Sequence, residues 1–366
     1  MIPGMSRRVY VHIGAPKTGT TYLQDRLGRN AAELARHDVH FPSRSRFVRP
    51  ETFHFRAALD LLGQDWGGPP GHAEGAWPAM VRRVRRLDGT VVISHEILAP
   101  APPEAVARLK SDLAGSELHV VYSARDLARQ VPAGWQESIK QGRRWSYRRY
   151  LDKVVRGRPW FARAFDLPTV LTLWGDGLPA DRVHVVTVPQ AEALAADPDL
   201  LWHRFCRAFG IDPAWAPLDS ESTNASLGSA ETQVLRRLNQ RLGRGVRRSD
   251  EYDALVLGML ATEALGRRSR PILLPPALHG WADERGHAFV EWLEHSGVDV
   301  VGDPSDLLPA PVPDQGFRHP DRVPTKAQLR AALDALAAMT REAAERPDPE
   351  ASLRGKVRRA RKAAQR

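Results

Sequence analysis

The most constraining feature of this sequence is a glycine-containing loop near its start, set between a β-branched stretch and an amphipathic one. Residues 8–13 alternate in character and are rich in β-branched side chains, which predicts a strand. Residues 20–36 carry apolar side chains at helical spacing, which predicts a helix. Such strand–loop–helix units bind phosphate, because backbone N–H groups and the helix N-terminus face the anion. Residues 14–19 are therefore the first candidate for an anion site.

Three further apolar runs have the length of buried strands, at residues 90–94, 118–123 and 183–188. Helical patterns separate them, at 103–113 and in one long stretch from 126 to about 150. Strands that alternate with helices indicate a parallel sheet. We therefore expect an α/β, P-loop-like three-layer fold, in which a central parallel sheet is flanked by helices. Helical C-terminal additions are predicted at 230–242, 252–265, 281–295 and 326–344.

The composition of the 366 residues, 42% hydrophobic and 26% charged, is ordinary for a globular protein. Nothing before residue 300 resembles a flexible linker, so we expect a single domain over 1–350. The basic C-terminal tail, 351–366, holds seven Lys or Arg and no acidic residue, and supplies most of the net charge of +10. The body is then near neutral, and we expect no specific nucleic-acid binding. The tail itself is either a solvated terminus or a contact for nucleic acid, anionic lipid or an acidic partner.

Other features of the sequence indicate the cellular compartment of the protein and limit the chemistry that it can perform. Cys206 is the single cysteine, which excludes an internal disulfide and favours a reducing compartment. Residues 1–10 lack the apolar core of a signal peptide, and no run of about 18 apolar residues occurs. We therefore expect a cytoplasmic protein without a membrane span. The histidines His12, His37 and His40 lack a metal-ligand spacing, so we expect no metal.

The loop differs from the common nucleotide-binding loop in the place of its lysine. Gly14 and Gly19 have the Walker A spacing, in which a lysine directly follows the second glycine. Here Thr20 stands at that position, and the lysine comes earlier, at Lys17. The displacement argues against an ordinary ATPase or kinase, whose lysine reaches the β- and γ-phosphates.

The order Pro16-Lys17-Thr18-Gly19-Thr20-Thr21 resembles the signature of sulfotransferases that use 3′-phosphoadenosine-5′-phosphosulfate (PAPS). Residues 11–24 are similar to a bacterial branch of that superfamily, and the resemblance continues less sharply to about residue 245. It implies that Lys17 contacts the 5′-phosphosulfate and its bridging oxygen. It also implies backbone or hydroxyl contacts to the same group from Ala15, Thr18, Gly19, Thr20 and Thr21.

The resemblance implies a second basic site for the 3′-phosphate of PAPS, at an arginine that ends a later strand. Arg125 follows the strand predicted at 118–123 and matches that position. Arginine also suits bidentate phosphate contact. The serine that the family often carries eight residues later falls on Ala133, which is a departure. The clamp then uses another side chain or is weaker, and the alternatives are Ser123, Gln136, Ser138 and Lys140.

The acceptor hydroxyl must lose a proton as it attacks sulfur, which requires a positioned base. His95 and Glu96 end the strand predicted at 90–94, where strand ends line the cleft of an open α/β sheet. His54 is a third candidate, because the heparan-type sulfotransferases take a glutamate base from a comparable segment. The sequence leaves all three residues open.

The sequence thus predicts a sulfotransferase that moves a sulfuryl group from PAPS to an acceptor hydroxyl and releases the bisphosphate PAP. The acceptor is a carbohydrate, lipid or small molecule, and residues 63–75 and 141–158 are candidates for its pocket. Two alternatives remain open at this point. One is a P-loop nucleotide kinase, and the other is a non-catalytic protein that binds PAP or another anion on the same scaffold.

Overall fold

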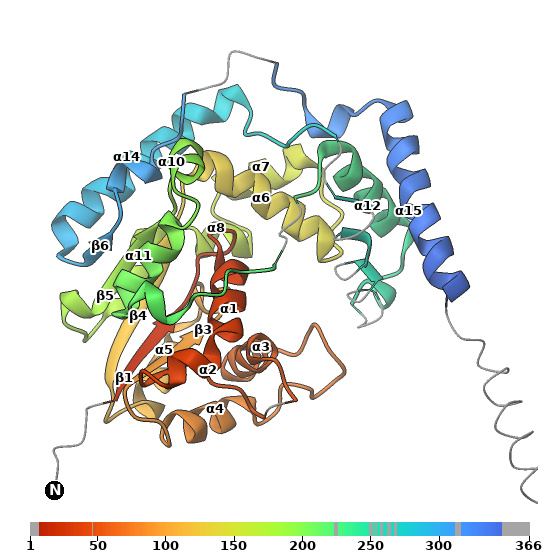
Figure 1. Ribbon diagram of the computed structural model, residues 1–366. Helices are drawn as coiled ribbons and strands as arrows, with labels where there is room; N and C mark the ends of the chain where they lie inside the picture. Colours follow the sequence, from red (N-terminus) through yellow and green to blue (C-terminus); the bar gives the residue numbers. More distant parts are fainter. Residues whose placement is uncertain are drawn as a thin grey trace, which may run out of the picture.

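The computed structural model describes residues 7–45, 47–222, 226–248, 252, 255–256, 259–261, 265–266, 269–311 and 316–345. In these ranges six strands form one sheet in which every pairing is parallel, in the order β2-β3-β1-β4-β5-β6. The strands are β1 (Arg8–His12), β2 (Val39–His40), β3 (Thr90–Ser94), β4 (Glu117–Ala124), β5 (Val183–Thr187) and β6 (Asp299–Val301). The first strand therefore lies in the middle of the sheet, between β3 and β4 (Figure 1).

Side chains alternate between the two faces of the sheet and divide the core into two apolar clusters. Tyr10, Val92 and Val121 belong to the smaller cluster, together with side chains of the helices on one face. Those helices are α1 (Thr20–Arg29), α2 (Ala31–Ala35) and α11 (Leu200–Phe209), next to which lies α10 (Ala191–Ala196).

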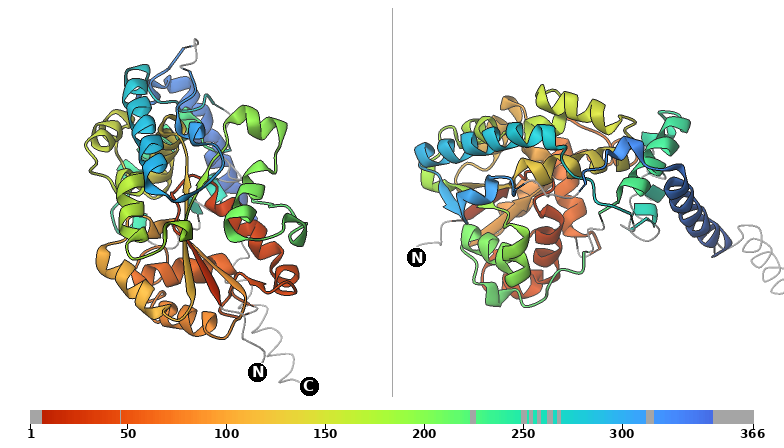
Figure 2. Two further views of the ribbon diagram at one scale, coloured as in Figure 1. Left: turned by 90° about the vertical axis from the view of Figure 1, so that its left-hand side faces the viewer. Right: turned by 90° about the horizontal axis from the view of Figure 1, so that it is seen from above.

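Val9, Val11 and Ile93 point the other way, into the larger cluster. The helices of that face are α3 (Pro50–Leu61), α4 (Ala76–Val84), α5 (Pro103–Asp112), α6 (Leu127–Lys140), α7 (Tyr147–Val155), α8 (Trp160–Ala164), α9 (Leu167–Gly175) and α14 (His279–Ser296). Beyond α6 the chain adds α12 (Ser229–Arg241), which packs between α6 and α15 (Thr325–Glu345). The predicted α/β fold, with a central parallel sheet flanked by helices and with helical C-terminal additions, is confirmed (Figures 1 and 2).

The first of two predicted continuous helices is broken at Asn30, which separates α1 from α2. The Asn30 amide donates to the carbonyls of Arg26 (2.8 Å) and Leu218 (2.7 Å) and accepts the Leu218 N–H (2.9 Å). These bonds tie the break to a segment almost 190 residues away, so local spacing did not reveal it.

The second break ends α6 at Lys140, where the sequence predicts a helix from 126 to about 150. Gly142 adopts the left-handed conformation (φ 80°), which ends a helix at no steric cost for glycine. Ser146 then caps α7, because its hydroxyl accepts the Arg149 N–H at 3.2 Å. Most of the helix predicted at 252–265 lies outside the described residues, and so does the whole of the basic tail.

A row of four polar side chains crosses β4, β5 and β6 on the α11 face. Glu117 Oε1 lies 2.9 Å from His119 Nε2, and His119 Nδ1 lies 2.9 Å from His184 Nε2. His184 Nδ1 lies 2.7 Å from Asp299 Oδ2. Tyr10 stacks on His119 with ring centroids 4.4 Å apart and covers the middle of the row. Among the described helices, none has both the length and the apolar character needed to cross a bilayer.

Candidate functional site

The candidate site lies at the carboxyl ends of β1 and β4, where the direction of the chain's connections changes. From β1 the chain runs through α1 towards β2 and β3, whereas β4 leads into α6 on the opposite face. Ligands of open α/β sheets bind at such switch points. The Ala15 N–H donates to the Ser123 carbonyl at 2.8 Å, so the loop after β1 is attached to the end of β4. The loop and Arg125 therefore lie on neighbouring strands at one edge.

A buried network of hydrogen bonds joins the loop to the ends of β3 and β4. The two ring nitrogens of His12 lie 2.8 Å from the Ser94 hydroxyl and 3.1 Å from the Ser123 hydroxyl, on the two neighbouring strands. The Thr18 hydroxyl contacts Ser123 and the Ala15 carbonyl. Burial lowers the pKa of His12 to about 3, so this ring is neutral at physiological pH. The network fixes the loop against β3 and β4 before any ligand binds.

The backbone of the loop is arranged to present N–H groups. Lys17 and Gly19 have positive φ angles, of 68° and 97°. The Pro16 carbonyl accepts the Gln130 side-chain amide at 2.9 Å, and the Lys17 carbonyl accepts Arg125 Nη1 at 3.2 Å. The carbonyls of Pro16 and Lys17 are thus held by the β4–α6 segment. The first N–H groups of a helix lack internal acceptors, so those of Thr20 and Thr21 are available to an anion.

Lys17 is paired with an acidic residue that was not predicted from the sequence to belong to the site. Its Nζ donates to Glu137 Oε2 at 3.1 Å, and Lys140 Nζ donates to the same oxygen at 2.8 Å. Burial alone would raise the pKa of Glu137, but the charges of Lys17 and Lys140 lower it to about 2. Glu137 is therefore an ionised counter-ion that connects α6 to the loop. Its position on the helix after Arg125, three residues before Lys140, was the only signal in the sequence.

Glu96 lies directly beside the loop, at the start of a 3₁₀ turn (Glu96–Leu98) that follows β3. A Cβ atom on Gly14 would lie 3.0 Å from the Cα atom of Glu96, so only glycine permits this approach. Burial raises the pKa of the Glu96 carboxyl, and the positive charge of Lys17 partly opposes the shift. The buried Thr20 hydroxyl also lowers this pKa, although no hydrogen bond of ordinary geometry joins the two. Glu96 and Lys17 are thus electrostatic neighbours in one site.

The two histidine candidates occupy different surroundings. His54 is 1% exposed, its Nδ1 accepts the Ser94 N–H at 3.0 Å, and its Nε2 donates to the Pro42 carbonyl at 2.9 Å. Both ring nitrogens are therefore used by the backbone. His95 Nδ1 accepts the Ile97 N–H at 3.3 Å, and its ring lies 5.1 Å from that of Phe55. Burial lowers the pKa of His54 to about 4 and that of His95 to about 3.

Arg125 carries a donor with no partner. Its Nη1 bonds the loop, whereas its Nε is buried and has no hydrogen-bond partner in the described part of the chain. Burial, followed by the nearby charge of Arg129, lowers the pKa of Arg125 to about 10, so the guanidinium stays charged at neutral pH. The Thr20 hydroxyl at the other side of the loop is likewise buried without a hydrogen bond. A bound anion is able to satisfy both of these groups.

Three of the four side chains that could replace a serine at position 133 already have other hydrogen-bond or ion-pair partners. Ser123 bonds His12 and Thr18, and the Ser138 hydroxyl donates to the Trp135 carbonyl of its own helix at 2.7 Å. Lys140 pairs with Glu137. Of the four alternatives only Gln136 has no such partner among the described residues, and this residue is half-buried on α6.

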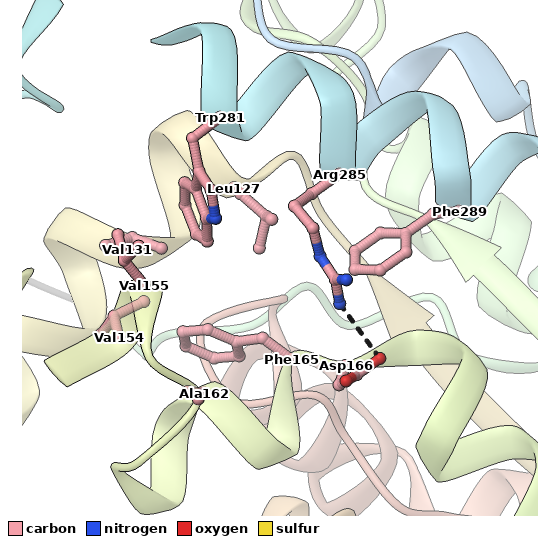
Figure 3. Close-up of a pocket in the computed structure, with 11 residues that line it drawn as sticks. Leu127, Val131, Val154, Val155, Ala162, Phe165, Asp166, Trp281, Arg285 and Phe289 are labelled. Atoms are coloured by element: carbon pink, nitrogen blue, oxygen red, sulfur yellow. Dashed lines mark ion pairs between the residues drawn. The ribbon is translucent and has the colours of Figure 1, made fainter. Parts of the chain in front are cut away.

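A separate cavity of about 190 Å³ lies on the other side of α6 (Figure 3). Leu127 and Val131 of α6 face Trp281 and Phe289 of α14 across it, and Arg285 pairs with Asp166 at 3.3 Å. Val154, Val155 and Gly157, from the segment 141–158 predicted for the acceptor, line the cavity, whereas none of the predicted catalytic or cofactor-binding residues does. Within the described ranges, no cluster of three or more His, Cys, Asp or Glu side chains is suited to a metal ion.

No protein-family model matches this sequence, and no curated protein matches it. Among solved structures, the chain is similar to the crystal structure of a sulfotransferase from Alicyclobacillus acidocaldarius. The similarity has a TM-score of 0.37 and 16% sequence identity, and it covers 65% of this chain and 98% of that chain. At these values the similarity does not place the chain in a family.

Proposed function

We propose that this protein is a PAPS-dependent sulfotransferase, which moves a sulfuryl group to a hydroxyl of a carbohydrate, lipid or small-molecule acceptor. The observation that carries the proposal is the pairing of two cationic groups across one switch point. Lys17 lies in the loop after β1, and Arg125 follows β4 and bonds the carbonyl of Lys17 itself. A donor with a phosphosulfate at one end and a 3′-phosphate at the other matches two separate cationic positions of this kind.

The orphaned donors fit such a ligand. Among the described residues Arg125 Nε is buried without a hydrogen-bond partner, and the Thr20 hydroxyl has none of ordinary geometry. A phosphate oxygen is a good acceptor for both. Lys17, Thr20 and Thr21 would bind the phosphosulfate, together with the backbone N–H groups of residues 17–19. The Ala15 N–H already donates to the Ser123 carbonyl at 2.8 Å, and Pro16 has no N–H. Arg125 would bind the 3′-phosphate, with Gln136 as the most available polar neighbour in place of a serine at 133.

In the proposed reaction the acceptor oxygen forms a bond to sulfur while the bond from sulfur to the bridging oxygen breaks. Negative charge then accumulates on the departing phosphate, where the Lys17 ammonium stabilises it. The acceptor proton passes to Glu96, whose burial raises the pKa of its carboxyl and so strengthens it as a base. The contacts of His54 favour Glu96 over it, because both nitrogens of that ring already serve the backbone.

Ligand-induced thermal stabilisation tests the donor. PAP is expected to raise the melting temperature by several degrees at concentrations well above its Kd, and ATP much less, since the site offers no lysine in the Walker A position. Sulfate transfer is then followed with labelled PAPS across a panel of hydroxylated acceptors. Greater stabilisation by ATP than by PAP would support a nucleotide kinase, and PAP binding without any turnover would support a non-catalytic binding protein.

The variant Arg125→Ala is expected to weaken PAP binding by roughly 10- to 100-fold, because it removes a charge-assisted contact to phosphate. Isothermal calorimetry measures this directly. Acceptor affinity should change much less, since Arg125 lies on the donor side of the loop. The matched control is Arg82→Ala, an exposed arginine on α4 that lies outside the candidate donor and acceptor segments. Equal PAP affinity in Arg125→Ala and wild type would remove Arg125 from the site.

A further inference from the structure

The outer face of α15 is an exposed apolar surface that the proposed chemistry does not use. Leu329, Leu333 and Leu336 are 58%, 55% and 59% exposed, and Met339 is 37% exposed. The opposite face of the helix is buried and packs towards α12, through Gln328, Ala331, Ala335 and Ala338. Figure 2 shows α15 at the edge of the molecule, away from the sheet. The helix therefore has one packed face and one apolar face without cover in the described chain.

The spacing of these side chains makes the surface continuous. Steps of four, three and three residues place Leu329 to Met339 along one side of a helix, and Thr340 and Ala343 extend the same side. By the same spacing, Arg330, Asp334 and Arg341 lie together on its flank. The stripe itself is uncharged and apolar, as in a helix that lies in a membrane interface, but the flank is of mixed charge, so attraction to an anionic surface must come from residues after the helix.

The sequence beyond α15 adds the matching charge. Residues 351–366 contain seven Lys or Arg and no Asp or Glu. Only five residues separate them from the end of α15 at Glu345, and such a segment spans at most roughly 20 Å. The basic tail and the leucine face can therefore reach the same surface.

We propose that α15 and the basic tail together bind the surface of an anionic lipid bilayer. Leu329, Leu333 and Leu336 enter the boundary between headgroups and acyl chains, and the basic tail pairs with lipid phosphates. A coiled coil with a second copy matches the stripe less well, because three leucines cover one heptad and coiled coils need about three to four. Nucleic acid would match the tail but would leave the leucines without a role.

Co-sedimentation of the full-length protein with vesicles tests the proposal. Vesicles of phosphatidylcholine with about 30% phosphatidylglycerol should bind the protein, and roughly 0.5 M NaCl should weaken that binding by screening the charges. Neutral phosphatidylcholine vesicles should bind at least tenfold more weakly, by the loss of roughly one to two charge contacts. Equal binding to both vesicle types would overturn the proposal.

Two variants separate the contributions. The triple variant Leu329→Gln, Leu333→Gln, Leu336→Gln keeps good helix formers and should lose about tenfold or more of vesicle affinity. Removal of residues 351–366 should cause a comparable loss, while Leu218→Gln, which changes an exposed leucine elsewhere, should bind as wild type. An unchanged melting temperature confirms that the triple variant is folded.

Three results would contradict a membrane role. The first is unchanged vesicle binding in the folded triple variant. The second is a wild-type dimer that becomes monomeric in the triple variant and does not sediment with vesicles, which would assign the leucine face to a second copy. The third is binding of duplex DNA through the tail without vesicle binding, which would assign the tail to nucleic acid.

Discussion

Replacement of Lys17 by alanine is expected to lower the turnover of PAPS by roughly 100- to 1,000-fold, the usual effect of removing one preorganised group that stabilises developing charge. The loss should appear in kcat more than in PAP binding, because Lys17 acts on charge that accumulates as the sulfur–oxygen bond breaks. Single-turnover measurements with labelled PAPS separate the two. Near-normal turnover in Lys17→Ala would refute the assigned role of the loop.

Lys17 also has an unusual backbone conformation, which provides an internal control. Its φ of 68° is costly for any residue with a Cβ atom and free of cost for glycine. Lys17→Gly therefore removes the amine and relaxes the backbone, whereas Lys17→Ala removes the amine alone. Equal losses in the two variants assign the effect to the amine, and a marked difference would assign it to the loop conformation. Lys110→Ala, at a lysine of α5 that donates to the Asp176 carbonyl at 2.6 Å and takes no part in the proposed site, should behave as wild type.

The variant Glu96→Gln is expected to lower kcat by roughly 100- to 10,000-fold, as for loss of a general base, with little change in size. PAP affinity should stay equal or rise slightly, because the variant removes a negative charge beside Lys17. A fall in PAP affinity that matches the fall in kcat would instead indicate a structural role for Glu96.

The pH dependence of the rate follows from the same environment. The base must be ionised, so kcat should fall as pH decreases through the pKa of Glu96. Burial raises that pKa, so the fall should occur above the range of an ordinary glutamate. In Lys17→Ala the charge that lowers this pKa is lost, so the residual activity should fall off at higher pH than in wild type. His54→Ala should lower the melting temperature and leave the position of this limb unchanged; loss of the limb there would make His54 the base.

The placement of Lys17 and Arg125, on which the proposed donor half of this site depends, could be predicted from the sequence because it depends on strand ends. Lys17 and Arg125 each follow a strand of readable length, and parallel strands place their carboxyl ends at one edge. Glu137 could not be predicted in the same way. Its contact with Lys17 depends on how α6 crosses the loop, and the two residues are 120 positions apart.

The structural role of His54 could not be predicted either, because it also depends on contacts between separate segments of the chain. A histidine in an amphipathic helix has the same pattern whether it serves a substrate or the backbone of a neighbouring strand. Only the contacts of its two ring nitrogens with Ser94 and Pro42 separate these cases. The break at Gly142, by contrast, had a local signal in the glycine itself, which the apolar pattern on either side obscured.

The number of available protons limits the hydrogen bonds in one row of polar side chains, formed by Glu117, His119, His184 and Asp299. Its three hydrogen bonds require three protons, and two neutral imidazoles carry only two. The hydrogen bond with His119 lowers the pKa of Glu117, so that carboxylate does not supply the third. Burial lowers the pKa of His119 and so favours its neutral form, which leaves the row one proton short. A neutral imidazole has a single N–H and can donate to only one of its two neighbours, so the tautomer of one ring constrains that of the other.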